Sequence, residues 1–374
     1  MPWPVLLLAR ELDLGGSERQ LTEIAKSLDR SRFEPHVGCF RPEGMRGREL
    51  AAAGVPIAHF PVTSLTSPDA WAGAWDLVRY VRRFRIRLVH TFDYPLTAFA
   101  VPVARLFTRA AVLSSQRSHR ELIPPRYRRV VRMTDHLADA VVANCEFIGR
   151  HLEQDEQVPA CRIRLCHNGI DLDEFQPCNR VQPPSLPPDS LVIGTVCALR
   201  PEKGLPSLLD AFARIRPMHD RLRLVIVGSG SMRDTLEAQA EMRGIRADCC
   251  FVPATDRVSG WLRAIDIFVL PSRSEAMSNS LLEAMACGCC PVASNVGGNP
   301  ELVQNGKTGL LFEPGDIVGL SEALDMLLRN HTLRLRLAAA ATQSVRERFS
   351  IRASAERMGE IYAEFIGRSP RTNA

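Results

Sequence analysis

The segment IFVLPSRSEAMSNSLLEAMA, residues 267–286, joins a short apolar run to a polar loop and the start of a second apolar segment. Residues 267–270 predict a buried strand and residues 281–287 a helix, which makes one strand–loop–helix unit of a parallel sheet. Two carboxylates, Glu275 and Glu283, lie eight positions apart in it. Such loops are where open α/β sheets bind ligands, so this segment predicts both a fold class and a site.

The same alternation of apolar runs and helical stretches extends through the chain. In the first half, we expect strands at 5–9, 37–40, 88–91, 112–115 and 140–143, and helices near 17–28, 46–53 and 70–84. In the second half, we expect strands at 191–197, 222–227, 250–252, 267–270, 291–294 and 309–312, and helices near 205–214, 231–244, 281–287, 317–329, 333–349 and 353–366. This alternation predicts parallel sheets covered by helices on both faces.

A polar, proline-rich segment separates the two halves. Residues 177–189 cannot continue a helix or a central strand, because proline lacks the backbone N–H that both require. We therefore expect an α/β protein with two doubly wound, Rossmann-like domains, residues 1–176 and 190–350, joined by a linker at 177–189. Because ligands bind at the carboxyl ends of the strands, the two domains are expected to face a central cleft.

Composition places the chain among soluble globular proteins. Its 374 residues suit about two domains, and 45% of them are hydrophobic and 24% charged. The net charge of +5 is too small to predict a nucleic-acid partner. The N-terminus lacks the features of a signal peptide, and no run reaches the roughly 18 apolar residues that span a membrane.

The 11 cysteines are scattered and form no CxxC pair. Such spacing indicates free thiols in a reducing cytoplasm, where we expect the protein to be located. Cys287, Cys289 and Cys290 suggest a metal site, but no histidine lies near them in sequence. Small residues beside a helix C-terminus are the better interpretation, and we expect neither a metal nor a cofactor.

A turn with two cations follows the first strand of the second half. Arg200 and Lys203 lie at its carboxyl end, and Pro201 and Gly204 mark the turn. Two fixed cations suit a diphosphate and stabilise the charge that a departing nucleoside diphosphate gains. A solvated surface turn is the alternative, but the loop with two glutamates in the same half favours a ligand site.

The two glutamates have unequal structural explanations. Glu275 lies in a loop and has no evident structural role, so we expect it to accept hydrogen bonds from sugar hydroxyls. Glu283 fits a capping box that starts at Ser280, and capping and ligand binding remain equally open for it. Ser278, Asn279 and Ser280 offer donors for phosphate at the helix start.

Two glycine turns are further candidates for the donor site. Gly228 follows a strand in Val-Gly-Ser-Gly, which is shorter than the dinucleotide pattern, so NAD is not favoured. This glycine allows close approach of a ligand or tight packing. In the first half, Gly15 and Gly16 expose a helix N-terminus, and Ser17 as a helix cap is the alternative explanation.

Acceptor-side candidates follow two strands of the first half. His90 ends one strand and Asp93 comes shortly after it. Gln116, Arg117 and His119 follow the next strand. Any of them is placed to contact an acceptor, whereas a lone histidine is more often structural.

Residues 76–132 are rich in arginine with interleaved aromatic residues. This pattern suits an anionic membrane surface, and a solvated arginine-rich face explains it as well. The inner face of the membrane is therefore a second expected location of the protein.

Taken in order, these motifs resemble the retaining glycosyltransferases of family 4, which have the GT-B fold. The matching motifs also include Asn-Gly-Ile-Asp at 168–171 and Gly-Gly-Asn-Pro-Glu at 297–301. The resemblance implies a nucleotide-sugar donor in the second domain, with Arg200 and Lys203 on the diphosphate, Glu275 on the sugar and Glu283 on the ribose. It also implies retention, no required metal, an acceptor on the first domain, and a final segment, 353–374, that crosses back onto that domain.

Two positions depart from the family pattern. Many relatives carry a histidine where this chain has Gln116, which puts a histidine-dependent step in doubt. Ala276 stands where glycine is frequent, although Ser278 and Asn279 resemble a recurrent variant of the loop.

We therefore predict a retaining hexosyltransferase that moves sugar from a nucleoside diphosphate, with a UDP-sugar as first choice, to a glycan or lipid-linked acceptor. Cell-surface polysaccharide or glycolipid synthesis is the expected setting. A GT-B nucleotide-sugar epimerase and a non-catalytic sugar-nucleotide-binding protein are the alternatives, and a dehydrogenase is the least favoured.

Overall fold

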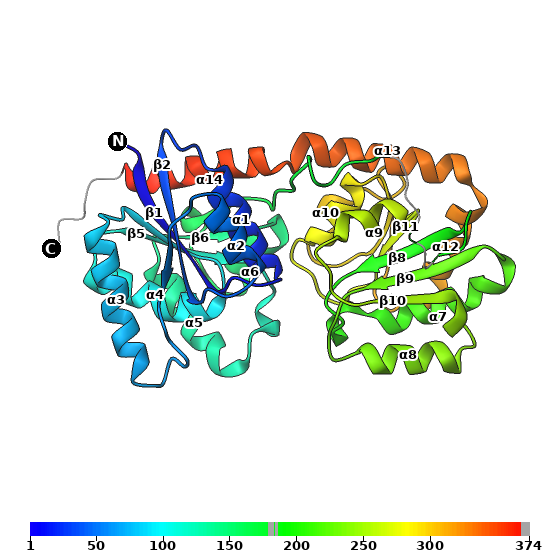
Figure 1. The fold of residues 1–374 in the computed structure, drawn as a ribbon, viewed down its shortest axis with the longest axis horizontal. Helices are drawn as coiled ribbons and strands as arrows, with labels where there is room; N and C mark the ends of the chain where they lie inside the picture. The colour runs from blue at the N-terminus through cyan, green and yellow to red at the C-terminus, as the bar shows by residue number, and fades with distance from the viewer. Residues whose placement is uncertain (179–182, 184–185, 368–374) are drawn as a thin grey trace. The chain divides into compact units, whose positions relative to one another are not determined.

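The computed structural model describes residues 1–178, 183 and 186–367, in two compact units (Figure 1). The first unit is Met1–Gly169 with Ile351–Ala374, and the second is Ile170–Ser350. Of the expected linker 177–189, residues 179–182 and 184–185 lie outside the described residues, as do residues 368–374 of the final segment. Each unit is a parallel sheet with covering helices, which confirms the predicted fold class.

The first unit contains a parallel sheet of seven strands in the order β3-β2-β1-β4-β5-β6-β7. The strands are β1 Trp3–Glu11, β2 Phe33–Arg41, β3 Ile57–His59, β4 Leu88–Thr91, β5 Ala111–Gln116, β6 Ala140–Ala143 and β7 Ile163–Leu165. The order reverses between β1 and β4, so the chain winds away from this point in both directions. In sheets of this type, the loops that leave the carboxyl ends on either side of the reversal form the ligand site.

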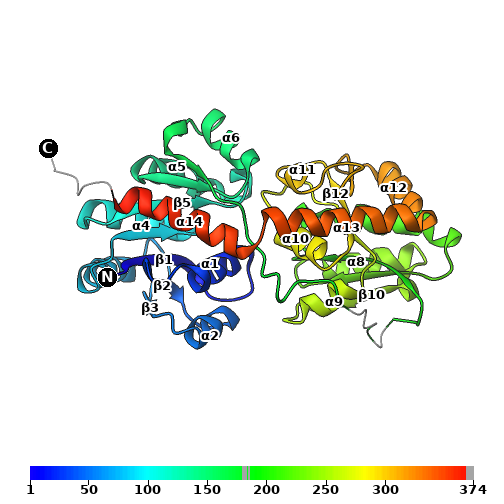
Figure 2. The same cartoon turned by 90° about the horizontal axis from the view of Figure 1, so that it is seen from above.

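Helices of the first unit cover two faces of the sheet. They are α1 Gly16–Ser27, α2 Met45–Ala52, α3 Asp69–Arg83, α4 Tyr94–Phe107, α5 Pro125–Leu137, α6 Glu146–Gln154 and α14 Ile351–Ile366, with single turns η1 Arg120–Leu122 and η2 Ala160–Arg162. One apolar core joins β1 to α1 and α14, and another joins it to α3 and α4. Figures 1 and 2 both show α14 beside α1, so the C-terminal helix completes the first unit.

The second unit contains a parallel sheet of six strands in the order β10-β9-β8-β11-β12-β13. The strands are β8 Leu191–Val196, β9 Leu222–Val227, β10 Cys249–Val252, β11 Ile267–Leu270, β12 Cys290–Ser294 and β13 Leu310–Phe312. The order reverses between β8 and β11. These strands precede the cationic turn and the loop with two glutamates, so the reversal brings the two motifs together.

The second unit has its own helices and core. Its helices are α7 Leu205–Ile215, α8 Arg233–Met242, α9 Val258–Ala264, α10 Asn279–Ala286, α11 Asn299–Leu302, α12 Ile317–Arg329 and α13 His331–Arg348, with turns η3 Pro201–Lys203, η4 Arg216–Met218 and η5 Arg246–Asp248. The core is built from alternate residues of the strands and from α7, α8, α12 and α13. Figure 2 shows α13 running beside α10, where Thr342 Oγ1 donates to the Met285 carbonyl at 2.7 Å.

Two glycines bring the loops of the second unit close to one another. Gly204 has φ +65°, and a Cβ there would lie 2.0 Å from the Pro271 carbonyl oxygen. Gly297 has φ +57°, and its Cβ would lie 1.8 Å from the Glu275 carbonyl oxygen. Both positions require glycine for conformation and for space, and both contacts fix the loop that follows β11.

Replacing Gly297 with alanine is expected to distort this loop. Gly306 is a matched control, because it has φ +75° but open space around a Cβ. We expect Gly306→Ala to lose about 1 kcal/mol of unfolding free energy from backbone strain alone, and Gly297→Ala to lose roughly 3 kcal/mol because the backbone must also move. Urea unfolding measures both, and equal losses would contradict the packing described for Gly297.

Candidate functional site

Loops on either side of the strand reversal make up the candidate site of the second unit. Residues 197–204 follow β8 and residues 271–278 follow β11. The Arg273 backbone N–H donates to the Glu202 carbonyl at 2.8 Å, which joins the two loops directly.

An ion pair lies between these loops. Lys203 Nζ is 2.6 Å from Glu275 Oε1, and Ser272 Oγ donates to the same oxygen at 2.7 Å. Glu275 is buried, with 8% of its surface exposed, and the Lys203 side chain is 21% exposed. The expectation that Glu275 has no structural role is therefore wrong, because it is the counter-charge of Lys203.

The pair keeps Lys203 charged despite its surroundings. Burial, the largest influence, lowers the pKa of Lys203, but the charge and hydrogen bond of Glu275 outweigh it and raise that pKa above its ordinary value. A lysine with a raised pKa stays protonated throughout the neutral range. The site therefore presents a fixed cation beside a carboxylate that still has a second oxygen for a ligand.

A second set of polar groups lies at the start of α10. Ser278 is its N-cap, and its Oγ accepts a hydrogen bond from the Leu281 N–H at 3.3 Å. The capping box predicted from Ser280 to Glu283 is wrong, since the helix begins two residues earlier. Glu283 is instead buried within α10, while Asn279 and Ser280 are only partly buried at its first turn.

Arg200 and Gly228 have different surroundings. The Arg200 side chain is 66% exposed and only loosely paired, with its Nη1 3.9 Å from Glu202 Oε1. Gly228 is buried, and a Cβ there would lie 1.9 Å from the Cys197 carbonyl oxygen. Of the two explanations for Gly228, tight packing is the one that the structure supports, because the close approach is to the backbone of the same chain.

In the first unit, two carboxylates, Glu18 and Asp93, lie at the starts of helices α1 and α4, in the loops beside the strand reversal. Gly15 is the N-cap of α1 and Gly16 its first residue, so Ser17 as the helix cap is wrong. The Glu18 carboxylate lies against Gly15 at this helix start. Asp93 caps α4 through Leu96, and it also accepts from the Arg10 N–H next to the reversal. Burial raises the pKa of Asp93 to about 7.

His90 is a packing residue of the first unit. It is fully buried, with Nδ1 2.8 Å from the Tyr362 hydroxyl and Nε2 2.9 Å from Ser115 Oγ. Burial lowers its pKa to about 3, so the ring stays neutral. Both ring nitrogens are used inside the unit, and the structure favours the structural explanation for this histidine.

The other acceptor-side candidates follow β5. Gln116 is buried, and its Nε2 donates to the Ser118 carbonyl at 2.6 Å. Arg117 is partly buried and donates to Asn168 Oδ1 at 2.5 Å. His119 caps η1 and stacks on His151, with ring centroids 4.3 Å apart. Of these three, Arg117 places its guanidinium beside Phe92, which follows β4 at the reversal.

Among the described residues, no group of three or more His, Cys, Asp or Glu side chains is arranged to hold a metal. Cys287 is the C-cap of α10, as the small-residue interpretation predicts. Cys289 is buried and its Sγ donates to the Leu262 carbonyl at 3.1 Å. The cysteine cluster thus has a packing explanation.

Similarity to known proteins covers both units. The family model described as Glycosyltransferase Family 4 matches residues 14–174, and the one described as Glycosyl transferases group 1 matches residues 180–344. The chain is 31% identical over 274 residues to a D-inositol 3-phosphate glycosyltransferase of Corynebacterium jeikeium, covering 69% of this chain and 65% of that protein. It is 26% identical over 348 residues to a sulfoquinovosyl transferase of Arabidopsis thaliana, covering 87% and 65%. The chain thus matches just under two thirds of the length of these relatives.

Solved structures show the same architecture. A glycosyltransferase from Rickettsia africae has a TM-score of 0.85 at 20% identity, over 98% of this chain and 100% of that one. Anabaena Alr3699/HepE in complex with UDP and glucose has a TM-score of 0.85 at 22% identity, over 96% and 99%. At such identities the structural likeness shows only the fold, whereas the two family models show the family. The chain therefore belongs to the family 4 glycosyltransferases and has their GT-B fold.

Proposed function

We propose that the chain transfers a sugar from a nucleoside diphosphate sugar to a glycan or lipid-linked acceptor, with retention of configuration. The observation that carries the proposal is the Lys203–Glu275 pair beside the strand reversal of the second unit. Complexes of Alr3699/HepE with UDP and with UDP-glucose support a UDP-sugar as the donor. Synthesis of cell-surface polysaccharide or glycolipid is the setting that we propose.

Each side chain of the site has a role in this reaction. The donor diphosphate takes over the Lys203 ammonium, and the exposed Arg200 adds a second cation. Both cations stabilise the negative charge that the leaving diphosphate gains, without a metal. Glu275 is then available to the sugar hydroxyls, and Glu283 is assigned to the ribose. The N–H groups at the start of α10 complete the phosphate site.

Two alternatives use the same donor site. A nucleotide-sugar epimerase would convert the donor without an acceptor, so incubation with donor alone separates it from a transferase. A non-catalytic binding protein would bind the donor but would neither hydrolyse nor transfer it across an acceptor panel. The paired charge at Lys203 favours a site that stabilises a leaving group over one that only binds.

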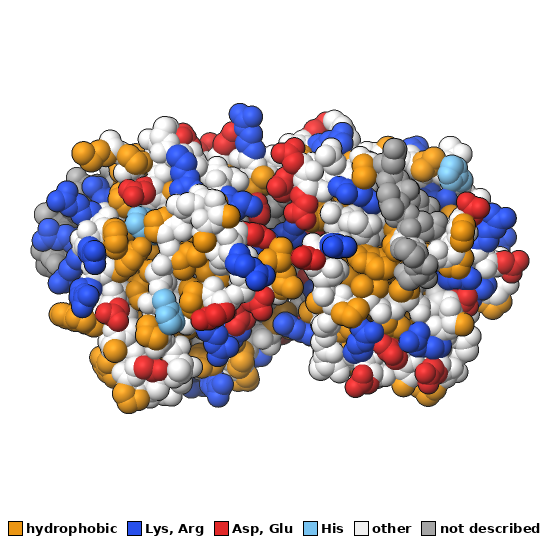
Figure 3. Space-filling view, in the orientation of Figure 1, with side chains coloured by type: hydrophobic (Ala, Val, Ile, Leu, Met, Phe, Trp, Pro, Cys, Tyr) orange, Lys and Arg blue, Asp and Glu red, His pale blue; other side chains and the backbone are white. Residues whose placement is uncertain are grey.

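An apolar and basic surface of the first unit suits a membrane partner. Helix α4 packs against both α3 and α5. The exposed residues of these helices and of the positions just after them form what we call the α3–α5 surface: Trp71, Trp75, Phe84, Leu106, Phe107, Val130, Met133 and Leu137, with Arg79, Arg82, Arg83, Arg109, Arg126 and Arg129. Figure 3 shows blue and orange side chains intermingled at the left of the view, over α3. We propose that this surface binds anionic lipid at the inner face of a membrane.

Within the described part of the chain, every helix is too short or too polar to cross a bilayer.

Donor binding and turnover test the proposed reaction. A UDP-sugar is expected to stabilise the fold by about 2.7 kcal/mol at 100 times its Kd. In a thermal-shift screen, GDP- and ADP-sugars at the same concentration are expected to stabilise it less. Lys203→Met and Glu275→Gln are each expected to lower turnover by roughly 100-fold or more. Lys307→Met, at an exposed lysine of the same unit, is the control. Near-native turnover by either variant, with folding confirmed by circular dichroism, would refute the assignment.

Vesicle sedimentation tests the α3–α5 surface. The protein is expected to sediment with vesicles containing anionic phosphatidylserine at low salt and to release as salt is raised. Arg126→Ala/Arg129→Ala should weaken binding, whereas Arg221→Ala/Arg336→Ala removes the same charge from exposed sites of the second unit and should not. Equal loss in both double variants, or no sedimentation at all, would exclude this surface as the membrane contact.

A further inference from the structure

Arg117 is a charged side chain without a charged partner. Its Nη2 donates to the neutral Asn168 amide oxygen at 2.5 Å, and its guanidinium lies 5.3 Å from the Phe92 ring centroid. Among the described residues, no carboxylate oxygen lies within ion-pair distance of it. A guanidinium has five N–H donors, so this arginine has donors to spare.

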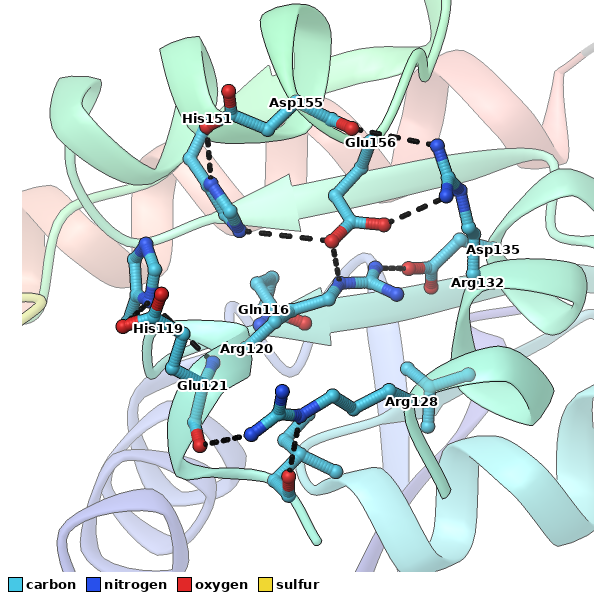
Figure 4. A network of polar contacts seen from close by, with 12 residues as sticks. Gln116, His119, Arg120, Glu121, Arg128, Arg132, Asp135, His151, Asp155 and Glu156 are labelled. Atoms are coloured by element: carbon cyan, nitrogen blue, oxygen red, sulfur yellow. Dashed lines mark hydrogen bonds and ion pairs between the residues drawn. The ribbon is translucent and has the colours of Figure 1, made fainter. Parts of the chain in front are cut away.

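Arg120, three residues further along, is a contrasting case. It is 3% exposed, its Nη2 donates to Asp135, and its Nε lies 3.5 Å from Glu156 Oε1. Figure 4 shows this arginine bonded to both carboxylates, with Arg132 also paired with Glu156. Two counter-charges explain Arg120 as the residue that anchors η1 to its neighbours, and Arg117 has no charged partner of this kind.

The backbone on both sides of Arg117, from Gln116 to Ile123, is held by contacts of neighbouring residues. Arg120 fixes η1 to α5, and Arg128 donates to the backbone carbonyls of Ile123 and Glu121 at 2.9 and 2.7 Å (Figure 4). Gln116 bonds to Ser118 on the other side of Arg117. The backbone on both sides is thus held by contacts that do not use the Arg117 guanidinium. A cation positioned in this way is pre-organised for a ligand.

The surroundings of Arg117 disfavour an uncompensated charge. Burial lowers its pKa from 12.5 to about 10, so it remains charged at neutral pH. The charge of Glu18 raises the pKa of Arg117, and burial raises the pKa of Glu18 itself. Leaving a partly buried charge without a counter-ion has a cost in free energy, and an incoming anion reduces that cost. Arginine in such a place forms short, paired hydrogen bonds to phosphate or carboxylate oxygens.

We propose that Arg117 binds an anionic group, a phosphate or a carboxylate, of the acceptor. This inference rests on the proposed function and on the acceptor position in the first unit that the family resemblance implies. Arg117 directly follows β5, and Phe92, against which it packs, directly follows β4 beside the strand reversal. The enzyme therefore selects acceptors that carry a negative charge near the accepting hydroxyl.

Calorimetric titration with inorganic phosphate tests the site without knowledge of the acceptor. The full chain is titrated with and without saturating UDP. Native protein and Arg48→Gln, an exposed arginine of the same unit, are expected to bind phosphate equally in the presence of UDP, and Arg117→Gln at least tenfold more weakly. No phosphate binding by the native chain, or unchanged binding by Arg117→Gln, would overturn the proposal.

UDP affinity separates the acceptor from the other source of phosphate, the donor. If Arg117→Gln binds UDP as the native chain does while losing phosphate, the anion belongs to the acceptor. If Arg117→Gln loses UDP affinity tenfold, the arginine serves the donor and the acceptor inference fails. Failure of the native chain to bind any nucleotide sugar would instead contradict the proposed function, and the titration without UDP would still decide whether Arg117 is an anion site.

Discussion

The contact between Lys203 and Glu275 is the interaction on which the account of the second unit depends. It lies between the loops that leave β8 and β11, where the strand order reverses. Neither group is stable alone in a site so shielded from water, since an unpaired buried charge costs several kcal/mol. Each charge is the partner of the other. In the reaction that we propose, donor binding exchanges these partners, so that phosphate replaces Glu275 on the ammonium and sugar hydroxyls replace the ammonium on Glu275.

The surrounding loops have little freedom to move. Gly204 packs closely against the Pro271 carbonyl, and Gly297 against the Glu275 carbonyl. Ser294 Oγ donates to the Ser272 carbonyl at 2.6 Å. These contacts come from the ends of β8 and β12 and meet at the loop that follows β11. These contacts position the Glu275 carboxylate, and through it the Lys203 ammonium. A cation positioned before the reaction is what electrostatic stabilisation of a leaving diphosphate requires.

The first unit handles its charges differently. Arg120 has two carboxylates, whereas Arg117 has a neutral amide and an aromatic ring. Burial raises the pKa of Asp93 to about 7 and lowers that of His90 to about 3. Arg117 differs from Arg120 in having no carboxylate partner, and that difference is the basis for proposing a ligand there.

Sequence patterns predicted much of this architecture but few of its contacts. The apolar runs identified both sheets because buried parallel strands need continuous apolar residues, and β4, β6, β9 and β11 have the predicted bounds. Helices α4 and α5 were missed because prolines lie in or at the start of both, and α4 is too apolar to show a polar face. The capping box was misplaced because Ser278 and Ser280 both suit an N-cap.

Contacts between distant residues could not be read from one sequence. Lys203 and Glu275 are 72 positions apart, and the pairing of Gln20 with Gly169 spans 149. The presence of charged residues was visible, but whether each had a partner was not. That distinction separates Arg117 from Arg120, and it came only from the folded chain.

A crystal structure of the protein with UDP-glucose tests the exchange of partners most directly. We predict that Lys203 Nζ bonds to a phosphate oxygen and that Glu275 bonds to a sugar hydroxyl, with the backbone of the loops after β8 and β11 unchanged. A complex in which the diphosphate binds elsewhere while the Lys203–Glu275 pair stays closed would contradict it.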